Sequence, residues 1–212
     1  MTQDTARVAH FDDAVYEEQC EIASFWTGSR LIVLASVFLY GTFAFAYFYL
    51  RALNSHGDWR VGNQHPSTLI GTAVVLCVVL ASVVHYSGAR RLQYGAQFDW
   101  FVASLVSLVL LVVGAALQIW DLTRLPFFPA SSGYTSLFVA WMPVYILYIL
   151  GTFYWLETLV AQSIARPHTV TVWNEDDQLL VPHFGAKVEG FIAFTLFMSV
   201  ASILIWILFY IL

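Results

Sequence analysis

Five long apolar stretches limit the folds that this chain can adopt. Each is close to or longer than the roughly 20 apolar residues that a helix needs to cross a bilayer. They cover residues 31–50, 67–86, 101–120, 137–162 and 190–212. Unpaired backbone groups are costly in lipid, and membrane-spanning strands would alternate in polarity, so these continuous runs must be helical. We therefore predict an all-α integral membrane protein with five transmembrane helices in a bundle.

The composition agrees with this prediction. Hydrophobic residues make up 59% of the 212 residues and charged residues only 11%, whereas a typical soluble domain is about 25% charged. A soluble fold of this size has too little interior to hide so much apolar surface. The net charge of −5 and the lack of clustered Lys and Arg residues argue against nucleic acid as a partner.

Residues 1–30 lie outside the predicted membrane domain, which covers residues 31–212. This first segment is acidic and lacks the basic start and short apolar core of a signal peptide, so we expect it to remain in the mature protein. Its sequence over residues 12–29 suggests an acidic helix that lies on the cytoplasmic membrane surface.

A second polar segment, residues 166–187, separates the last two apolar stretches. Residues 169–173 (Thr-Val-Thr-Val-Trp) alternate in polarity like a strand, and residues 174–177 (Asn-Glu-Asp-Asp) are typical of a turn. This pattern predicts a short cytoplasmic hairpin against the membrane surface.

Lysine and arginine residues in the short connections favour one orientation, because cytoplasmic loops carry an excess of them. One side of the predicted bundle holds Arg7, Arg30, Arg90, Arg91, Arg166 and Lys187, and the other holds Arg51, Arg60 and Arg124. We therefore expect the N-terminus in the cytoplasm and the C-terminus outside.

Histidine is the residue to consider first for haem or metal binding inside a membrane. Of the six histidines only His85 lies in or near a predicted span, so no two spans carry histidines at matching depth. Copper and zinc sites need clustered ligands, and the sequence has no such cluster. We expect no cofactor or metal to be bound by this chain.

Four polar residues are expected near the inner leaflet: His85, Asp99, Glu157 and Glu189. Ionisable groups within spans are costly and are candidates for function, so one interpretation is a proton-collecting patch. The other is that these side chains only reach the water at the headgroups, and we favour it because no charge continues through the middle of the membrane.

Three basic residues, Arg30, Arg90 and Arg91, are expected at the inner headgroup level. They could hold lipid phosphates through charge-assisted hydrogen bonds. They could equally serve only as anchors of their helices on the cytoplasmic side.

Several stretches carry a resemblance to a known family. They are Gly41–Arg51 (GTFAFAYFYLR), Asp58-Trp59, Pro66 with the apolar run to Ser82, Pro129–Phe138 (PASSGYTSLF) and Gly151. Together they resemble subunit III of haem–copper respiratory oxidases, in the five-span form of bacterial quinol and cytochrome c oxidases. The resemblance covers about residues 26–163, and the fifth span matches by position.

The resemblance implies a non-catalytic subunit of an aerobic respiratory enzyme in a prokaryotic cytoplasmic membrane. Subunit III of that family holds no haem or copper; those cofactors are in the catalytic subunit on which it packs. It binds phospholipid and supports proton uptake and oxygen access.

Three residues replace polar residues that are usual in the family. Gln118 stands near the end of the third span, where Gln and Glu-Tyr are usual. Tyr145 and Tyr148 stand in the fourth span, where a Gly-x-His-x-x-His stretch is usual. Their i, i+3 spacing places both tyrosines on one helix face, where each could keep a packing contact and one hydrogen bond.

Three other functions remain open. The chain could be an accessory subunit of a related oxidoreductase such as a nitric oxide reductase. It could be a small transporter or channel, although it lacks charge in the middle of its spans and internal repeats. It could also be a membrane enzyme that acts on lipid, with Glu157 and His85 as an acid–base pair.

Overall fold

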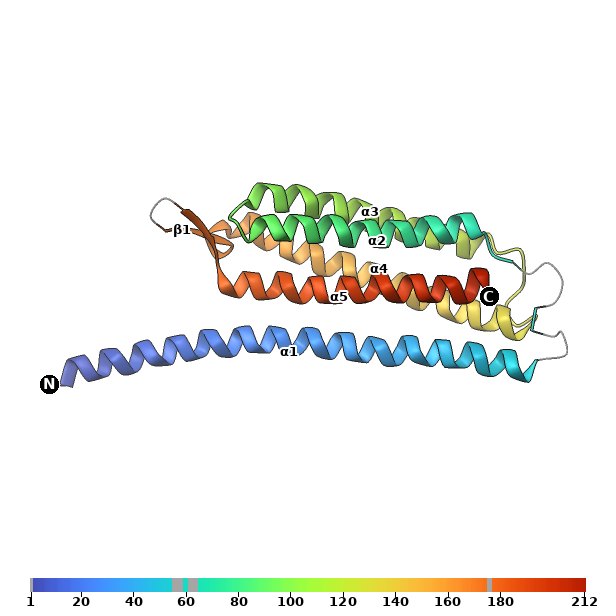
Figure 1. Ribbon diagram of the computed structural model, residues 1–212, viewed down its shortest axis with the longest axis horizontal. Coiled ribbons are helices and arrows are strands. Elements are labelled where there is room, and N and C mark those ends of the chain that lie inside the picture. Colours follow the sequence, from blue (N-terminus) through green and yellow to red (C-terminus); the bar gives the residue numbers. More distant parts are fainter. Residues whose placement is uncertain (1, 55–58, 61–64, 175–176) are drawn as a thin grey trace.

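The computed structural model describes residues 2–54, 59–60, 65–174 and 177–212. Its long helices are α1 (Thr2–Leu53), α2 (Thr68–Leu92), α3 (Gln97–Thr123), α4 (Gly133–Ala165) and α5 (Pro182–Trp206). All five are long and apolar enough to cross a membrane, and they lie side by side in Figure 1. The prediction of five membrane helices is therefore confirmed, and the chain is a multi-pass membrane protein.

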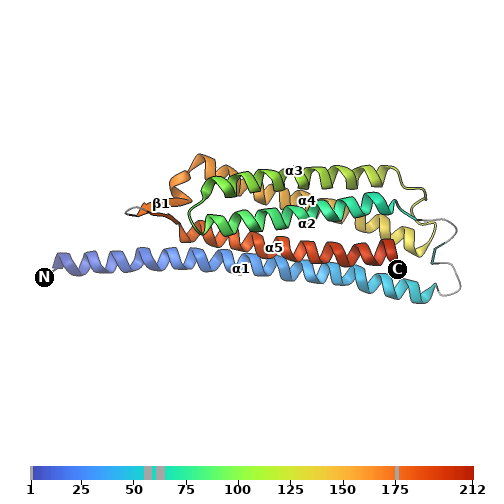
Figure 2. The same cartoon turned by 45° about the horizontal axis from the view of Figure 1, so that its top comes forward.

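Four of the helices, α2 to α5, form a compact bundle, and α1 lies along its side against α5 and α4 (Figures 1 and 2). Only 17% of the most apolar part of α1 is buried, compared with 44% for α5. A tight turn joins α2 to α3, and Gly95 adopts a φ of 79° there, which a side chain would disfavour. The α2–α3 pair is thus a helical hairpin inside the bundle, whereas α1 is peripheral.

Short elements mark the two ends of the bundle. A 3₁₀ turn, η1 (Pro167–Thr169), leads into strands β1 (Thr171–Asn174) and β2 (Asp177–Leu180), which pair antiparallel. A π-helix, η2 (Ile207–Ile211), continues α5 at the opposite end. We call the end of the bundle with β1 and β2 the hairpin end, and the end with η2 the C-terminal end. Figure 1 shows the N-terminus of the chain beyond the hairpin end. Asp58 of the family-like loop, and Glu175 and Asp176 of the expected turn, lie outside the described residues.

A single helix covers the acidic segment and the first span. We expected a separate surface helix over residues 12–29, but α1 runs unbroken from Thr2 to Leu53, and it extends past the other helices in Figure 1. The helix passes through Gly28 and Ser29 without a break, so residues 12–29 are not a separate helix. A contact at 3.1 Å between the Glu21 carboxylate and Nε2 of His183 in α5 holds α1 alongside the bundle.

Small residues allow α2 and α3 to approach closely. A Cβ atom on Gly88 would lie 2.5 Å from the Cβ of Ala103, and one on Gly114 would lie 3.3 Å from that of Cys77. Gly114 opens a stretch of three small residues in α3, of which Gly114 and Ala115 are buried and Ala116 is exposed.

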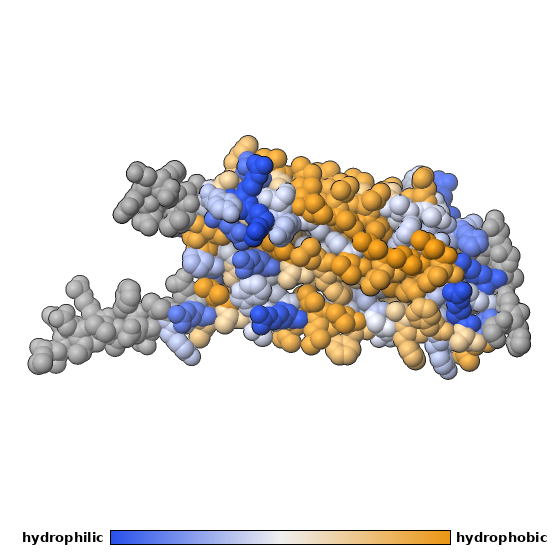
Figure 3. Space-filling view, viewed as in Figure 1, coloured by the Kyte–Doolittle hydropathy of each residue, from blue (hydrophilic) through white to orange (hydrophobic). Residues whose placement is uncertain are grey.

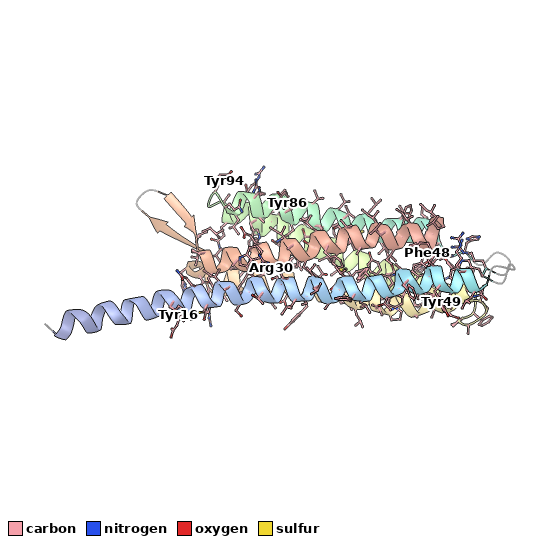
Figure 4. The ribbon with its side chains drawn as sticks, turned by 60° about the horizontal axis from the view of Figure 1, so that its bottom comes forward. Tyr16, Arg30, Phe48, Tyr49, Tyr86 and Tyr94 are labelled. Carbon is pink, nitrogen blue, oxygen red and sulfur yellow. The ribbon has the colours of Figure 1, made fainter. Side chains whose placement is uncertain are left out.

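The surface has the pattern of a membrane protein. Figure 3 shows a broad apolar zone across the middle of the visible face, with polar residues toward both ends. Figure 4 places Tyr86 and Tyr94 at the hairpin end, Phe48 and Tyr49 at the C-terminal end, and Tyr16 on the projecting part of α1. Aromatic residues at both ends of an apolar zone are typical of membrane–water interfaces.

Candidate functional site in the buried polar interior

A set of polar side chains lies inside the α2–α5 bundle, where most neighbours are apolar. Its members recur at spacings of three or four residues, which places them on the inner face of each helix. The buried ones are Ser82, His85, Ser104, Ser107, Thr152, Thr195, Ser199 and Ser202. Because polar groups in a membrane interior need hydrogen-bond partners, this set is the natural candidate for a functional site.

His85 is the ionisable member of the set, and it is 1% exposed. Its ring lies against the rings of Phe191 of α5, at 4.8 Å between centroids, and Trp100 of α3, at 6.3 Å. Its Nδ1 atom lies 3.4 Å from the hydroxyl oxygen of Ser104. Its Nε2 atom has no hydrogen-bond partner within the described part of the chain.

A cavity of about 10 Å³ lies beside this imidazole. Hydroxyl groups from all four helices of the bundle line it, together with apolar side chains. The polar lining residues are Ser82, His85, Ser107, Thr152 and Thr195. Such a space is close to the lower limit for one water molecule, which needs roughly 10–15 Å³.

Hydroxyl groups continue toward the C-terminal end. Ser199 donates to Ser82 at 2.8 Å. One turn farther along α5, the hydroxyl of Tyr145 donates to Ser202 at 2.8 Å, and Ser202 donates to the carbonyl oxygen of Met198 at 2.6 Å. These bonds join α2 and α4 to α5.

A second cavity, of about 20 Å³, lies beyond Tyr145 and is also lined by Gln118 and Trp206. Gln118 donates to the sulfur of Met142 at 3.0 Å, and the indole nitrogen of Trp206 has no partner among the described residues. Each cavity therefore has, among its lining residues, one nitrogen atom without a partner in the described part of the chain.

The C-terminal end of the bundle carries a buried acid, Asp121, which directly follows the apolar stretch of residues 101–120. Asp121 is helical and 3% exposed, and it accepts a hydrogen bond from Tyr210 at 3.2 Å. The guanidinium of Arg60 lies 4.0 Å from the ring centroid of Tyr134 and donates to the carbonyl oxygen of Phe209 at 3.2 Å. These contacts join Arg60 and η2 to the rest of the bundle.

The four residues expected to form an inner-leaflet patch do not share one environment. His85 is buried, whereas Glu157 and Glu189 are exposed. Asp99 pairs with Arg91 at 2.8 Å in a largely solvent-accessible ion pair. An acid–base pair of Glu157 with His85 is thus not formed, which removes the geometric basis for the lipid-enzyme hypothesis.

The three basic residues expected at the headgroup level are all exposed. Arg30 lies 5.6 Å from the ring of Trp26, and Arg90 lies 6.0 Å from that of Tyr86. Figure 4 shows Arg30 on α1 and Tyr86 toward the hairpin end of α2. The positions suit either lipid contact or anchoring.

Tyr145 and Tyr148 each make one side-chain hydrogen bond, which matches the expectation from their spacing. Tyr145 bonds to Ser202 as described above, and Tyr148 donates to Ser36 of α1 at 3.1 Å. Tyr148 also packs against Tyr40 at 5.4 Å between ring centroids. Both therefore serve helix packing.

No group of three or more His, Cys, Asp or Glu residues in the described ranges is arranged to hold a metal ion. The polar interior instead offers hydroxyl oxygens and one imidazole, groups that can bind water or relay a proton. The sequence analysis singled out His85 but missed the hydroxyls around it. The spacing of the serines could have indicated them. Ser104 and Ser107 lie three residues apart in the third span, and Ser199 and Ser202 lie three residues apart in the fifth, so each pair shares one helix face.

The stretches that carry the family resemblance meet at the C-terminal end. The ring of Trp59 lies 5.1 Å from that of Tyr47 and 5.8 Å from that of Tyr134. The backbone N–H of Tyr134 donates to the carbonyl oxygen of Trp59 at 3.3 Å. A Cβ atom on Gly133 would lie 3.1 Å from Nδ2 of Asn54 and 3.3 Å from the Trp59 ring, so glycine allows a closer approach here than other residues would. We call Tyr47, Trp59, Gly133 and Tyr134 the aromatic junction.

Comparisons with known proteins give no assignment. No protein-family model matches the chain. A comparison with curated proteins likewise finds no match. Inference about function therefore rests on the residues and their geometry.

Proposed function

We propose that this chain is a cofactor-free accessory subunit of a haem–copper terminal oxidase, equivalent to subunit III. In this role it packs on the catalytic subunit, which holds the haem and copper. It binds phospholipid and supports proton uptake and oxygen access in aerobic electron transport.

The aromatic junction is the observation that carries this proposal. Three of the stretches that carry the resemblance supply Tyr47, Trp59 and the Gly133–Tyr134 pair. These residues contact one another, as expected if the stretches preserve one packing arrangement.

The outward surfaces of the helices also favour an accessory role. Large apolar residues of α1 are exposed along the membrane zone, among them Phe38 at 70% and Phe45 at 69%. They can face a larger partner subunit or lipid. An apolar groove of about 260 Å³ between α1 and α5, lined in part by Tyr40, Gly41 and Leu204, could hold part of a lipid acyl chain.

The proposal includes a location in a prokaryotic cytoplasmic membrane with the hairpin end in the cytoplasm. Cys20 offers a test of this orientation because it is exposed on α1 near that end. In a Cys77→Ala variant, a membrane-impermeant maleimide should label Cys20 only after the cytoplasmic side is opened. Labelling of Cys20 in intact cells would show that the hairpin end lies outside and would contradict the proposed orientation.

The association with an oxidase can be tested by gentle purification of the tagged chain from its native membrane. We expect haem of a, b or o type in the reduced-minus-oxidised spectrum, together with a large catalytic subunit. An unrelated tagged membrane protein from the same cells is the control. A haem-free, partnerless chain would refute the proposal, and a haem complex that reduces nitric oxide instead of oxygen would favour the related reductase.

A further inference from the structure

The cavity beside His85 poses a hydrogen-bonding question that the accessory role does not answer. A buried polar atom without a hydrogen-bond partner destabilises the folded state. His85 Nε2 is such an atom, and the imidazole belongs to a cavity lining that also contains four hydroxyl side chains. We propose that this cavity is a binding site for a single water molecule, which bridges His85 Nε2 to hydroxyl groups of the neighbouring helices.

The size and lining of the cavity select water over other ligands. Its volume of about 10 Å³ leaves no room for a lipid chain or a larger solute. A buried water typically makes about three hydrogen bonds to polar groups, and empty cavities in proteins are apolar. The lining of this cavity is mainly apolar, but it is not wholly so: it includes the imidazole whose Nε2 atom lacks a partner, and one water molecule can supply that partner.

The hydroxyl groups that line the cavity are available as acceptors. Ser107 donates to the carbonyl oxygen of Ala81 at 2.8 Å, and Thr152 donates to that of Tyr148 at 2.7 Å. Thr195 donates to the carbonyl oxygen of Ile192 at 3.1 Å. Each hydroxyl thus uses its proton on the backbone and keeps oxygen lone pairs that can accept from water.

This arrangement also fixes the tautomer of a neutral His85. A water molecule can donate two hydrogen bonds to the hydroxyl oxygens and still needs a donor for its own oxygen. The lining hydroxyls already donate elsewhere, so the remaining donor is His85 Nε2–H. The Nδ1 atom then accepts from the hydroxyl of Ser104, which lies 3.4 Å away. The site assigns the proton to Nε2.

The proposed water connects α2, α3, α4 and α5 through one imidazole and hydroxyls of its neighbours. It would link these helices by hydrogen bonds in a region where they otherwise pack through apolar side chains. This inference does not depend on the proposed role in an oxidase, since it uses only contacts within the bundle.

Solid-state NMR of the full chain in lipid bilayers, with ¹⁵N-labelled histidine, tests the site. We expect the His85 signals to show a protonated Nε2, an unprotonated Nδ1 and a cross-peak from Nε2–H to water. Loss of the signals in His85→Asn identifies them, and contact with the Phe191 ring identifies them independently if that variant fails to fold. A protonated Nδ1, or no contact with water, would overturn the proposal.

A pair of threonine variants locates the water. Thr152 lines the cavity, whereas Thr158 lies farther along α4 and is exposed. Thr152→Val removes an acceptor at nearly constant volume, so it should weaken the water cross-peak of His85. Thr158→Val should leave the cross-peak unchanged. An undiminished cross-peak in Thr152→Val would contradict this placement of the water.

Discussion

Replacement of Gly88 by alanine tests the close packing of α2 on α3. The new methyl group would lie 2.5 Å from the Cβ of Ala103 and 3.3 Å from the Cα of Trp100. Carbon atoms pack best at about 3.5–4.0 Å, so the helices would have to separate by about 1 Å or more at this point. Overpacking of this kind costs about 1–3 kcal/mol. We expect the free energy of unfolding of Gly88→Ala to be lower by that amount than that of a helical Gly→Ala variant without such a clash.

The matched control is Gly151→Ala, because Gly151 is also helical and has nothing within 4 Å of an added Cβ. Both variants gain the same helix propensity, so the difference between them isolates the packing cost. Reversible unfolding in mixed micelles, followed by tryptophan fluorescence, gives both free energies. Adding Ala103→Gly to Gly88→Ala should recover most of the loss. Equal stability of Gly88→Ala and Gly151→Ala would refute the close-packing argument.

Three further variants separate buried from exposed interactions. Tyr145→Phe removes the donor to Ser202 and should cost about 0.6–1.7 kcal/mol in the same unfolding assay, while Tyr154→Phe, at a residue 67% exposed, should cost nothing measurable. Arg91→Ala breaks a solvent-accessible ion pair and should cost less than about 1 kcal/mol; a larger loss would mean that the pair is shielded by lipid or a partner. Glu157→Gln, at an exposed position, should leave oxygen consumption by the proposed complex unchanged, and a severe defect in proton uptake would show that this carboxylate has a role in the complex.

The helices could be predicted from the sequence because continuous apolar runs have few alternatives in lipid. Their ends were less predictable. Residues 97–100 extend α3 beyond its apolar stretch, and Asp121 continues it at the other end. Polar side chains at such positions can belong to a loop or to a helix that leaves the hydrocarbon. Only tertiary contacts, such as that of Asp121 with Tyr210, decide between them.

The polar interior was only partly predictable for a different reason. Serine and threonine in spans often bond to their own helix, as Thr72 does with the carbonyl oxygen of Thr68. Sequence therefore does not reveal which hydroxyls also face a cavity. His85 was visible as an ionisable residue near a span, but its burial against Phe191 depends on how α5 packs. That packing involves residues more than a hundred positions apart.

The central claim is that this chain is a stoichiometric, cofactor-free subunit of a haem–copper oxidase. Native mass spectrometry of the complex purified through the tagged chain tests it most directly. The account predicts that collisional activation releases one copy of the chain, at 23.9 kDa plus the mass of the tag, without haem, and that every haem stays with the remaining catalytic subunits. Detection of the chain without partner subunits, or of haem bound to the released chain, would contradict this claim.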